Sequence, residues 1–553
     1  MMPQDRTLPM HRSGPRRRGG FFLILVLVVV AVCTMAVYSF TELMVAYEDS
    51  TYLSADLVQA RVNVESGVDT TRLLLSKPPA TRIDYGGVFN NPSMFQAVNV
   101  SMGTDNATAS SFTVVAPGLT ETGTYGGIRF GLQNESARLN INTLVILEEN
   151  SDLILPAMLV TGTETDEMET DNIAVSLLMA LPGMTLEIAD AILDWLDEDE
   201  EPRLYGAESE TYTSLPTPYS PTNGPLLSVE ELLLVRGVTP ALLFGADANR
   251  NGVLDADEQA RYGVGIETPG ALGWAAYLTV FGAEANKTRD GSARVNVNQD
   301  DMELLYEELL EAIGDETYAS YIVAFRIAGK SSTVAAADSA AGEEEESVDG
   351  VWSIEMMDQV DLSGEAGNSI NQVLDLVGST VTLGNGDNAR TYASPFQEDP
   401  VSMAVYLPVL MDVIATQDSE TMPGRINLNE CPAELLYGIP ILDEETVQAI
   451  IEARSAESDD PNRNYGTWPL VEGIVTIEQM RSLMPLLTGG GDVYRAQIVG
   501  FFEDSGISSR SEVIIDATTV NPKVVSWQNL SHLGRGFEQS VLGSRTMLNA
   551  ADN

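Results

Sequence analysis

Histidine and cysteine are nearly absent from this chain of 553 residues, which contains two of each. Cys33 and Cys431 lie far apart, so no internal disulfide framework is expected. His11 and His532 lie near the two ends, which argues against a histidine metal cluster or a histidine-based triad in the body of the chain. The glycines at 489–491 are not followed by the lysine and hydroxyl residue of a phosphate-binding loop. We therefore expect no enzyme, although a hydrolase built from carboxylates alone stays open.

Basic residues are also scarce. The chain has 30 lysine and arginine residues against 81 aspartate and glutamate residues, a formal net charge of −51 at pH 7. The electrostatic field of so negative a chain repels nucleic acid and favours the binding of divalent cations. The length allows roughly two to four domains, and a hydrophobic content of 44% can build their cores.

Proline and charge are missing from the N-terminal region. No proline occurs between Pro15 and Pro78, and residues 21–40 carry no charge. About 20 apolar residues are enough to cross a bilayer as a helix. Since three arginines at 16–18 precede the run, the N-terminus is predicted in the cytoplasm and the rest of the chain on the outer side.

The apolar run has three other interpretations. A secretory signal would be shorter and would end at a small-x-small site, for which residues 34–36 are poor. A lipoprotein signal needs a small residue before Cys33, where the chain has Val32. A plain anchor stays open. Apolar positions from Leu53 to Leu75 recur every three or four residues, which predicts one helix of roughly 55 residues, about 80 Å long.

The basic leader ending in Gly19-Gly20, joined to this helix, resembles the class III leader of type IV pilins and type II secretion pseudopilins. The resemblance implies cleavage after Gly20 by a prepilin peptidase and methylation of Phe21. Most members carry a glutamate at the fifth mature position, where this chain has Leu25. That absence, and the Ala-Arg and Glu-x-Gly-Val pattern in residues 55–68, resemble the K-type minor pseudopilin, the general secretion pathway protein K family.

This resemblance implies a function. The chain would be a minor pseudopilin at the tip of the type II secretion pseudopilus, helping to start assembly and to export folded proteins across the outer membrane. Its partners would be the I-type and J-type minor pseudopilins, the inner-membrane secretion platform and membrane lipid, without nucleic acid. It would cross the bacterial inner membrane once, with its N-terminus cytoplasmic and its bulk periplasmic. The alternatives are a minor tip pilin of a type IV pilus and a calcium-stabilised surface adhesin.

Residues 247–258 fit the twelve-position calcium loop. Gly252 stands at the sixth position, where a sharp turn is required, and Glu258 stands at the last, where a bidentate carboxylate is required. The flanks are short for paired helices, so we expect one structural Ca²⁺ site and no sensor; a metal-free turn is the alternative. The oxygen ligands would be Asp247, Asn249, Asn251, the Val253 carbonyl, Asp255 and Glu258.

A second acidic stretch covers residues 194–202. It resembles an Asp-Trp-x-Asp-x-Asp-x-x-Pro segment of the K-type family, which is known to bind calcium, and the Gly-Ala-Glu that follows there is matched by 206–208. A solvated loop is the usual explanation of such a charge run. If a second ion binds, its ligands would be Asp194, Asp197, Asp199 and Glu208.

Internal repeats organise the middle of the chain. An Arg-x-Asn-x-Asn pattern suits a short buried extended segment, and its second asparagine suits a helix cap. The same part of the chain contains helix pairs that resemble helix-hairpin-helix motifs. In two of them Thr185 and Thr239 replace the second glycine of the hairpin, which argues against an exported DNA receptor. The pattern occurs at 138–142, 294–298 and 425–429, and the helix pairs at 177–193, 230–243 and 435–451.

Short strand patterns lie before residue 134 and again from 494 to 527. They predict an α+β fold in which a long N-terminal transmembrane helix packs on a pilin-like antiparallel sheet, interrupted by a large helical insert with helix-hairpin-helix-like repeats. The predicted divisions are a leader at 1–20, the helix at 21–77, the first part of the sheet at 78–145, the insert at 146–489 with a flexible linker at 331–350, closing strands at 490–535 and a loose tail at 536–553.

Overall fold

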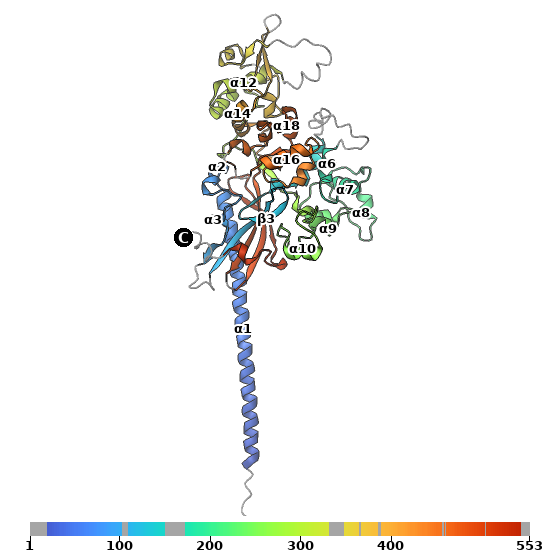
Figure 1. The fold of residues 1–553 in the computed structure, drawn as a ribbon, viewed down its shortest axis with the longest axis vertical. Helices are drawn as coiled ribbons and strands as arrows, with labels where there is room; N and C mark the ends of the chain where they lie inside the picture. Colours follow the sequence, from blue (N-terminus) through green and yellow to red (C-terminus); the bar gives the residue numbers. More distant parts are fainter. Residues whose placement is uncertain are drawn as a thin grey trace, which may run out of the picture. The chain divides into compact units, whose positions relative to one another are not determined.

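The structure is a computed structural model. It describes residues 19–101, 109–149, 172–330, 348–363, 366–384, 389–455, 458, 460–503 and 505–543, so most of the predicted linker lies outside the described residues. The chain forms two units, Met1–Gln59 and Ala60–Asn553. The first unit contains the beginning of helix α1 (Gly19–Leu75), and the second contains the end of α1 and the other helices and strands described here (Figure 1).

Helix α1 confirms the prediction of one helix that continues beyond the apolar run. It has 57 residues and ends three residues before Pro78, which cannot donate a backbone hydrogen bond. Within the described part of the chain, α1 is the helix long and apolar enough to cross a membrane. The side chains of Phe22 to Phe40 are exposed to the surroundings of the described residues.

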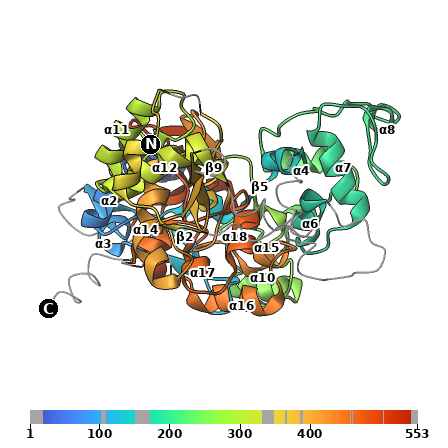
Figure 2. The same ribbon diagram turned by 90° about the horizontal axis from the view of Figure 1, so that it is seen from above.

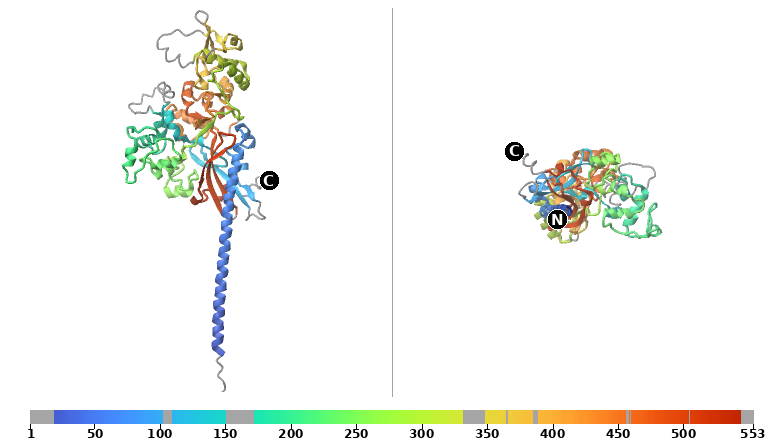
Figure 3. Two further views of the ribbon diagram at one scale, coloured as in Figure 1. Left: turned by 180° about the vertical axis from the view of Figure 1, so that it is seen from behind. Right: turned by 90° about the horizontal axis from the view of Figure 1, so that it is seen from below.

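The end of α1 packs on an antiparallel sheet. Ala60, Val64 and Val68 are buried there, and Figure 3 shows this part of the helix lying across the strands. Two glycines permit the close approach. A Cβ at Gly500 would lie 2.1 Å from the carbonyl oxygen of Ala60, and one at Gly67 would lie 2.6 Å from Ile498.

The main sheet in the described residues has seven strands, ordered β1-β2-β17-β18-β19, with β3 paired to β2 and β4 to β17. All of these pairs are antiparallel. The insert therefore leaves the sheet after β4 and returns at β17, which confirms the predicted fold class. The strands are β1 (Val98–Ser101), β2 (Ser110–Leu119), β3 (Tyr125–Arg129), β4 (Gln133–Asn134), β17 (Val493–Phe502), β18 (Ser508–Asp516) and β19 (Lys523–Asn529).

The two faces of the sheet have different partners because side chains alternate along a strand. Ala496 and Ile498 of β17 lie in the hydrophobic cluster that contains the end of α1. Val499 and Phe501 lie in a second cluster with Phe537. We call this second side the insert-facing side, because residues of the insert contact it.

The insert is largely helical, and α6, α7 and α8 lie side by side in Figures 1 and 2. The three predicted helix-hairpin-helix-like regions contain the pairs α6 and α7, a 3₁₀ segment (Val229–Leu234) and α9, and α15 and α16. The described helices are α4 (Leu144–Glu149), α6 (Ile173–Met179), α7 (Leu186–Leu196), α8 (Ser209–Thr213), α9 (Pro240–Phe244), α10 (Ala256–Tyr262), α11 (Met302–Ile313), α12 (Glu316–Ala328), α14 (Pro400–Val413), α15 (Ala433–Tyr437), α16 (Glu444–Ala453), α17 (Trp468–Val471) and α18 (Ile477–Leu483), with α2 (Pro79–Arg82) and α3 (Pro92–Phe95) next to the sheet.

Short strands join the helices of the insert. A four-stranded sheet has the order β10-β12-β11-β9, and β14 pairs with β7. The three Arg-x-Asn-x-Asn repeats each form a two-residue strand in a parallel pair: β5 with β6, β8 with β13 and β15 with β16. The bounds are β5 (Leu139–Asn140), β6 (Leu278–Thr279), β7 (Ala283–Ala285), β8 (Val295–Asn296), β9 (Gly329–Lys330), β10 (Gly350–Val351), β11 (Thr380–Leu383), β12 (Arg390–Ala393), β13 (Ile414–Ala415), β14 (Thr421–Pro423), β15 (Ile426–Asn427) and β16 (Leu487–Thr488).

The asparagines of these repeats do not act as predicted. The first one caps the turn that follows it, as when Asn427 accepts a hydrogen bond from the amide of Asn429. The second one, expected to cap a helix, instead holds a distant segment: Asn429 donates to the carbonyls of Arg463 and Gly489. A side-chain amide can satisfy buried backbone groups in this way. In the other two repeats, the first asparagine (Asn140 or Asn296) likewise caps the turn and the second (Asn142 or Asn298) donates to a distant carbonyl.

The expectation of a loose tail is wrong for residues 536–543. Phe537 and Leu542 are buried against Val499 and Phe501 of β17, and helix α19 (Gln539–Leu542) follows. Two large apolar side chains bury enough surface to hold this short segment, at ~1.5–3 kcal/mol each.

Candidate functional site

The predicted calcium loop, residues 247–258, connects α9 to α10. Gly252 has φ +79°, in the left-handed region, where the loop requires its sharp turn. The amide of Gly252 donates to Asp247 Oδ2 at 2.9 Å, which folds the first half of the loop around the carboxylate. Asp255 then caps α10, and Glu258 completes a capping box.

The side chains at the candidate ligand positions turn into the loop. Asp247, Asn251 and Glu258 are between 2% and 8% exposed. The amides of Asn249 and Asp255 both donate to Glu258, at 3.1 Å. The Glu258 carboxylate, at the last position of the loop, therefore holds Asn249 and Asp255 at the third and ninth positions together. Val253 is also buried, and its amide donates to Asn251 Oδ1 at 2.9 Å.

The donor set suits a hard cation with oxygen ligands. Asn249 Oδ1 is buried and has no hydrogen-bond partner. The side-chain nitrogen Nδ2 of the same residue donates a hydrogen bond to Asp255 Oδ2 at 2.7 Å. Burial and the nearby Glu258 carboxylate raise the pKa of Asp247 to about 7, despite hydrogen bonds from backbone amides. A cation close to these two carboxylates would favour their ionised forms.

The second candidate site lies after α7. Oxygens of Asp197, Asp199 and Glu208 lie within 4.8 Å of one another, and we call these three residues the acidic group. It is the one such group among the residues that the structure describes. Glu208 is 5% exposed and neither of its oxygens has a hydrogen-bond partner. Burial, followed by repulsion from Asp194 and Asp197, raises its pKa to about 7. The group can therefore hold a metal ion.

Asp194, predicted as the fourth ligand, has a different partner. Its Oδ1 accepts a hydrogen bond from Arg203 Nη1 at 2.8 Å, and the same nitrogen contacts Asp197. Arg203 also pairs with Glu148 at 2.8 Å. The guanidinium neutralises part of the acidic stretch, so a cation at the acidic group would share Asp197 with Arg203. The sequence pattern did not identify Arg203, although it is the one basic residue in 194–208.

Gly20 and Phe21, the predicted cleavage and methylation positions, lie in the first turn of α1. Residues 1–18 lie outside the described residues. The cleavage site therefore stays a prediction from the sequence.

A network of buried ion pairs lies on the insert-facing side of the sheet, next to the end of β4. Glu135 is fully buried and accepts from Arg495 Nε of β17 at 2.6 Å. Arg495 also pairs with Glu512 of β18 at 2.7 Å, and Thr279 of β6 donates to Glu135. Burial alone would raise the pKa of Glu135, but Arg495 and Arg138 outweigh burial and lower it. Through Thr279, the insert thus contacts a charge that is both buried and paired.

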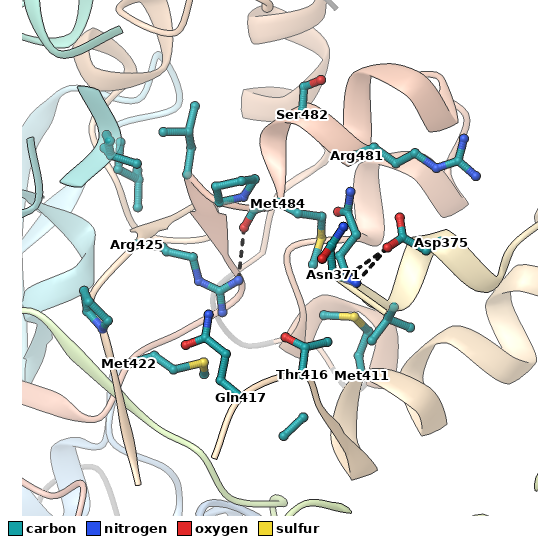
Figure 4. A pocket seen from close by; sticks show the side chains of 18 of the residues that line it. Asn371, Asp375, Met411, Thr416, Gln417, Met422, Arg425, Arg481, Ser482 and Met484 are labelled. Atoms are coloured by element: carbon teal, nitrogen blue, oxygen red, sulfur yellow. Dashed lines mark hydrogen bonds between the residues drawn. The ribbon is translucent and has the colours of Figure 1, made fainter. Parts of the chain in front are cut away.

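A cavity of about 890 Å³ lies among the three repeats of the insert. Its walls are largely apolar, and polar groups at its edge engage other groups of the chain (Figure 4). Arg425 donates to the Met484 carbonyl at 3.1 Å and pairs with Glu284, and Asp375 accepts from the amide of Asn371. Two other lining side chains have an oxygen, Asn286 Oδ1 and Gln372 Oε1, that is buried without a hydrogen-bond partner.

Comparisons with known proteins agree on one family. Residues 137–244 match the family model described as type II secretion system (T2SS), protein K. Type II secretion system protein K of Klebsiella pneumoniae is 41% identical over 61 residues, 11% of this chain and 19% of that protein. The protein of the same name from Dickeya chrysanthemi is 41% identical over 61 residues, 16% of its length. The alignments thus span less than a fifth of these curated relatives.

A solved structure is also similar: the GspK-GspI-GspJ complex of the enterotoxigenic Escherichia coli type 2 secretion system. The match covers 87% of this chain and 99% of that chain, with 10% identity and a TM-score of 0.34.

Proposed function

We propose that this chain, which belongs to the type II secretion system protein K family, is the minor pseudopilin at the tip of a pseudopilus and helps to start its assembly. The observation that carries the proposal is the position of the family's domain. The match at residues 137–244 begins just after β4, where the insert leaves a sheet on which the end of α1 packs. A pilin-like sheet interrupted by this domain is the arrangement that the resemblance implies.

The membrane part supports the same role. Helix α1 provides one apolar span, and the arginines at 16–18 favour a cytoplasmic N-terminus. Cleavage after Gly20 would free Phe21 for methylation. The bulk of the chain would then lie in the periplasm, with the I-type and J-type minor pseudopilins, the inner-membrane platform and lipid as partners.

Leu25 supports the tip position. An ionised side chain within the bilayer is costly unless it has a partner. In other pseudopilins the glutamate at this position is thought to pair with the N-terminus of the neighbouring subunit. A subunit at the tip has no neighbour above it, so an apolar residue avoids an unpaired charge in lipid.

We propose that calcium stabilises the periplasmic part. The calcium loop would bind one ion through Asp247, Asn249, Asn251, the Val253 carbonyl, Asp255 and Glu258. The acidic group, with Asp194 next to it, would bind a second. The ions would be structural, since both sites lie within the insert and serve to fix its loops.

Deleting the gene tests the proposed role. The mutant should retain type II cargo in the periplasm, and a plasmid copy of the chain should restore export. Normal export combined with loss of surface pili would favour a type IV tip pilin, and normal export combined with loss of adhesion would favour an adhesin. Either result would overturn the secretion role.

In a Glu208→Gln background, which removes a ligand of the acidic group, replacing Glu258 with glutamine should remove the stabilisation by calcium. Glutamine can still accept the capping hydrogen bonds, but it lacks the charge and the bidentate binding mode of the carboxylate. At a calcium concentration of about 100 times Kd, the parent chain with its intact loop should gain about 2.7 kcal/mol. Thermal unfolding with EDTA and with calcium measures the difference. Asp257→Ala changes an exposed neighbour and should leave the calcium effect intact; an equal calcium effect in Glu258→Gln would rule out the loop as a site.

A further inference from the structure

Three consecutive residues of the calcium loop make contacts outside it, two with the sheet and one with the C-terminal segment. The carbonyl of Asn249 accepts from Arg510 Nη2 of β18. The carbonyl of Arg250 accepts from Gln497 Nε2 of β17 at 2.7 Å. The side chain of Asn251 donates to the Gly536 carbonyl at 2.6 Å.

These contacts fix the part of the loop that carries two candidate ligands. The residue between Asn249 and Asn251 has an unusual backbone conformation. Arg250 has φ +56°, which is uncommon for a residue with a side chain. Its carbonyl points out of the loop and is received by Gln497. The sheet thus holds the loop in a strained form that the free segment would rarely adopt.

Gly536 forms the third contact, at the start of the C-terminal segment. A Cβ at this position would lie 1.7 Å from Arg510 Nη1, so the backbone here covers the buried guanidinium. The next residue, Phe537, is buried in the cluster on the insert-facing side. The loop, Arg510 and the C-terminal segment therefore form one packed interface.

We propose that Gln497, Arg510 and Gly536 are positioning residues of the calcium loop, so that a bound ion fastens the helical insert and the C-terminal segment to the sheet. The inference rests on the proposed calcium site. The partners pre-order the backbone of residues 249–251, which lowers the entropy cost of binding the ion. By reciprocity, the ion must stabilise the docking of residues 536–542 to the same extent.

Arg510 is unsuited to the test because its substitution would have two opposite effects. Its guanidinium holds the Asn249 carbonyl, but it is also fully buried near Asp247, Asp255 and Glu258, where it repels a cation. Neutral substitutions at the other two positions avoid this conflict.

The experiment measures calcium affinity in the full chain in detergent, in a Glu208→Gln background that removes a ligand of the acidic group. Gln497→Leu and Gly536→Ala should each weaken calcium binding by about 5- to 30-fold, the range of a moderate coupling between sites. Gly534→Ala is the control for Gly536→Ala, because Gly534 has φ +89° but open space at its Cβ position. Gln448→Leu, on an exposed position of α16, is the control for Gln497→Leu. Both controls should stay within about twofold of the parent, as surface changes usually do.

A second measurement separates positioning from general stability. Calcium should slow hydrogen exchange at residues 536–542 in the parent chain, and much less in Gln497→Leu. If calcium binds the parent but the affinities of all four variants agree, or if the variants lower the melting temperature equally with EDTA and with calcium, the positioning role is wrong. If the parent with an intact loop binds no calcium, the proposed calcium site itself fails.

Discussion

A chain carrying Gly20→Val should accumulate as a precursor that keeps residues 1–20 and should fail to support secretion. In the proposed pathway the peptidase cuts after Gly20, where a branched side chain would obstruct the scissile bond. The retained arginines at 16–18 would then hold the N-terminus at the cytoplasmic surface, because moving them into lipid is costly. Helix α1 could not leave the bilayer to join a growing fibre.

N-terminal sequencing of the protein purified from membranes measures this directly. The wild-type chain should begin at methylated Phe21, and the Gly20→Val chain at Met1. Gly19→Val is the matched control, because it places the same side chain one residue further from the cleaved bond than Gly20→Val does. A wild-type chain that begins near Tyr38, or that retains Met1, would contradict processing by a prepilin peptidase.

The largest effect on stability is expected from Glu135→Gln. Breaking a buried ion pair typically costs ~3–5 kcal/mol, because the remaining charge stays buried without its partner. Arg495 would keep Glu512 at 2.7 Å, so we expect about 3 kcal/mol, near the lower end of that range. Urea unfolding of the full chain in detergent, followed by circular dichroism, measures the change.

The control for Glu135→Gln is the exposed pair Asp69 and Arg72, whose charged atoms are 3.7 Å apart. Asp69→Asn should cost less than about 0.5 kcal/mol, as exposed pairs usually do. Since the pKa of Glu135 is lowered in the folded chain, its contribution should be present above the unfolded value of 4.5 and should be lost as pH falls below it. Equal stabilities of Glu135→Gln and wild type at pH 7 would show that this network does not stabilise the folded chain.

Local patterns explain the features that could be predicted. The absence of proline and charge at residues 21–40 predicts a membrane helix whatever the remainder of the chain does. The short strand pattern at 494–502 predicts a strand, and the structure has β17 there. The calcium loop stays a prediction, made because its candidate ligands and its glycine lie within twelve consecutive positions.

Contacts between distant residues explain what was missed. The second asparagine of each repeat was expected to cap a helix, but Asn429 holds the carbonyls of Arg463 and Gly489. The C-terminal segment was expected to be loose, but Phe537 finds an apolar cluster on β17. Neither partner can be identified from sequence spacing, since either side chain could satisfy its hydrogen bonds or bury its surface in several places.

The sequence by itself determined the long apolar N-terminal helix, the excess of negative charge and the spacing of the candidate oxygen ligands, because each depends on neighbouring residues or on composition. The tertiary structure alone decided that Glu135 meets Arg495 and that the calcium loop meets Gln497, Arg510 and Gly536. These groups are separated by hundreds of residues, and only the return of the chain to the same sheet brings them together. Because these groups are buried at that interface, the loss of one partner would leave a buried polar group unpaired, which is costly.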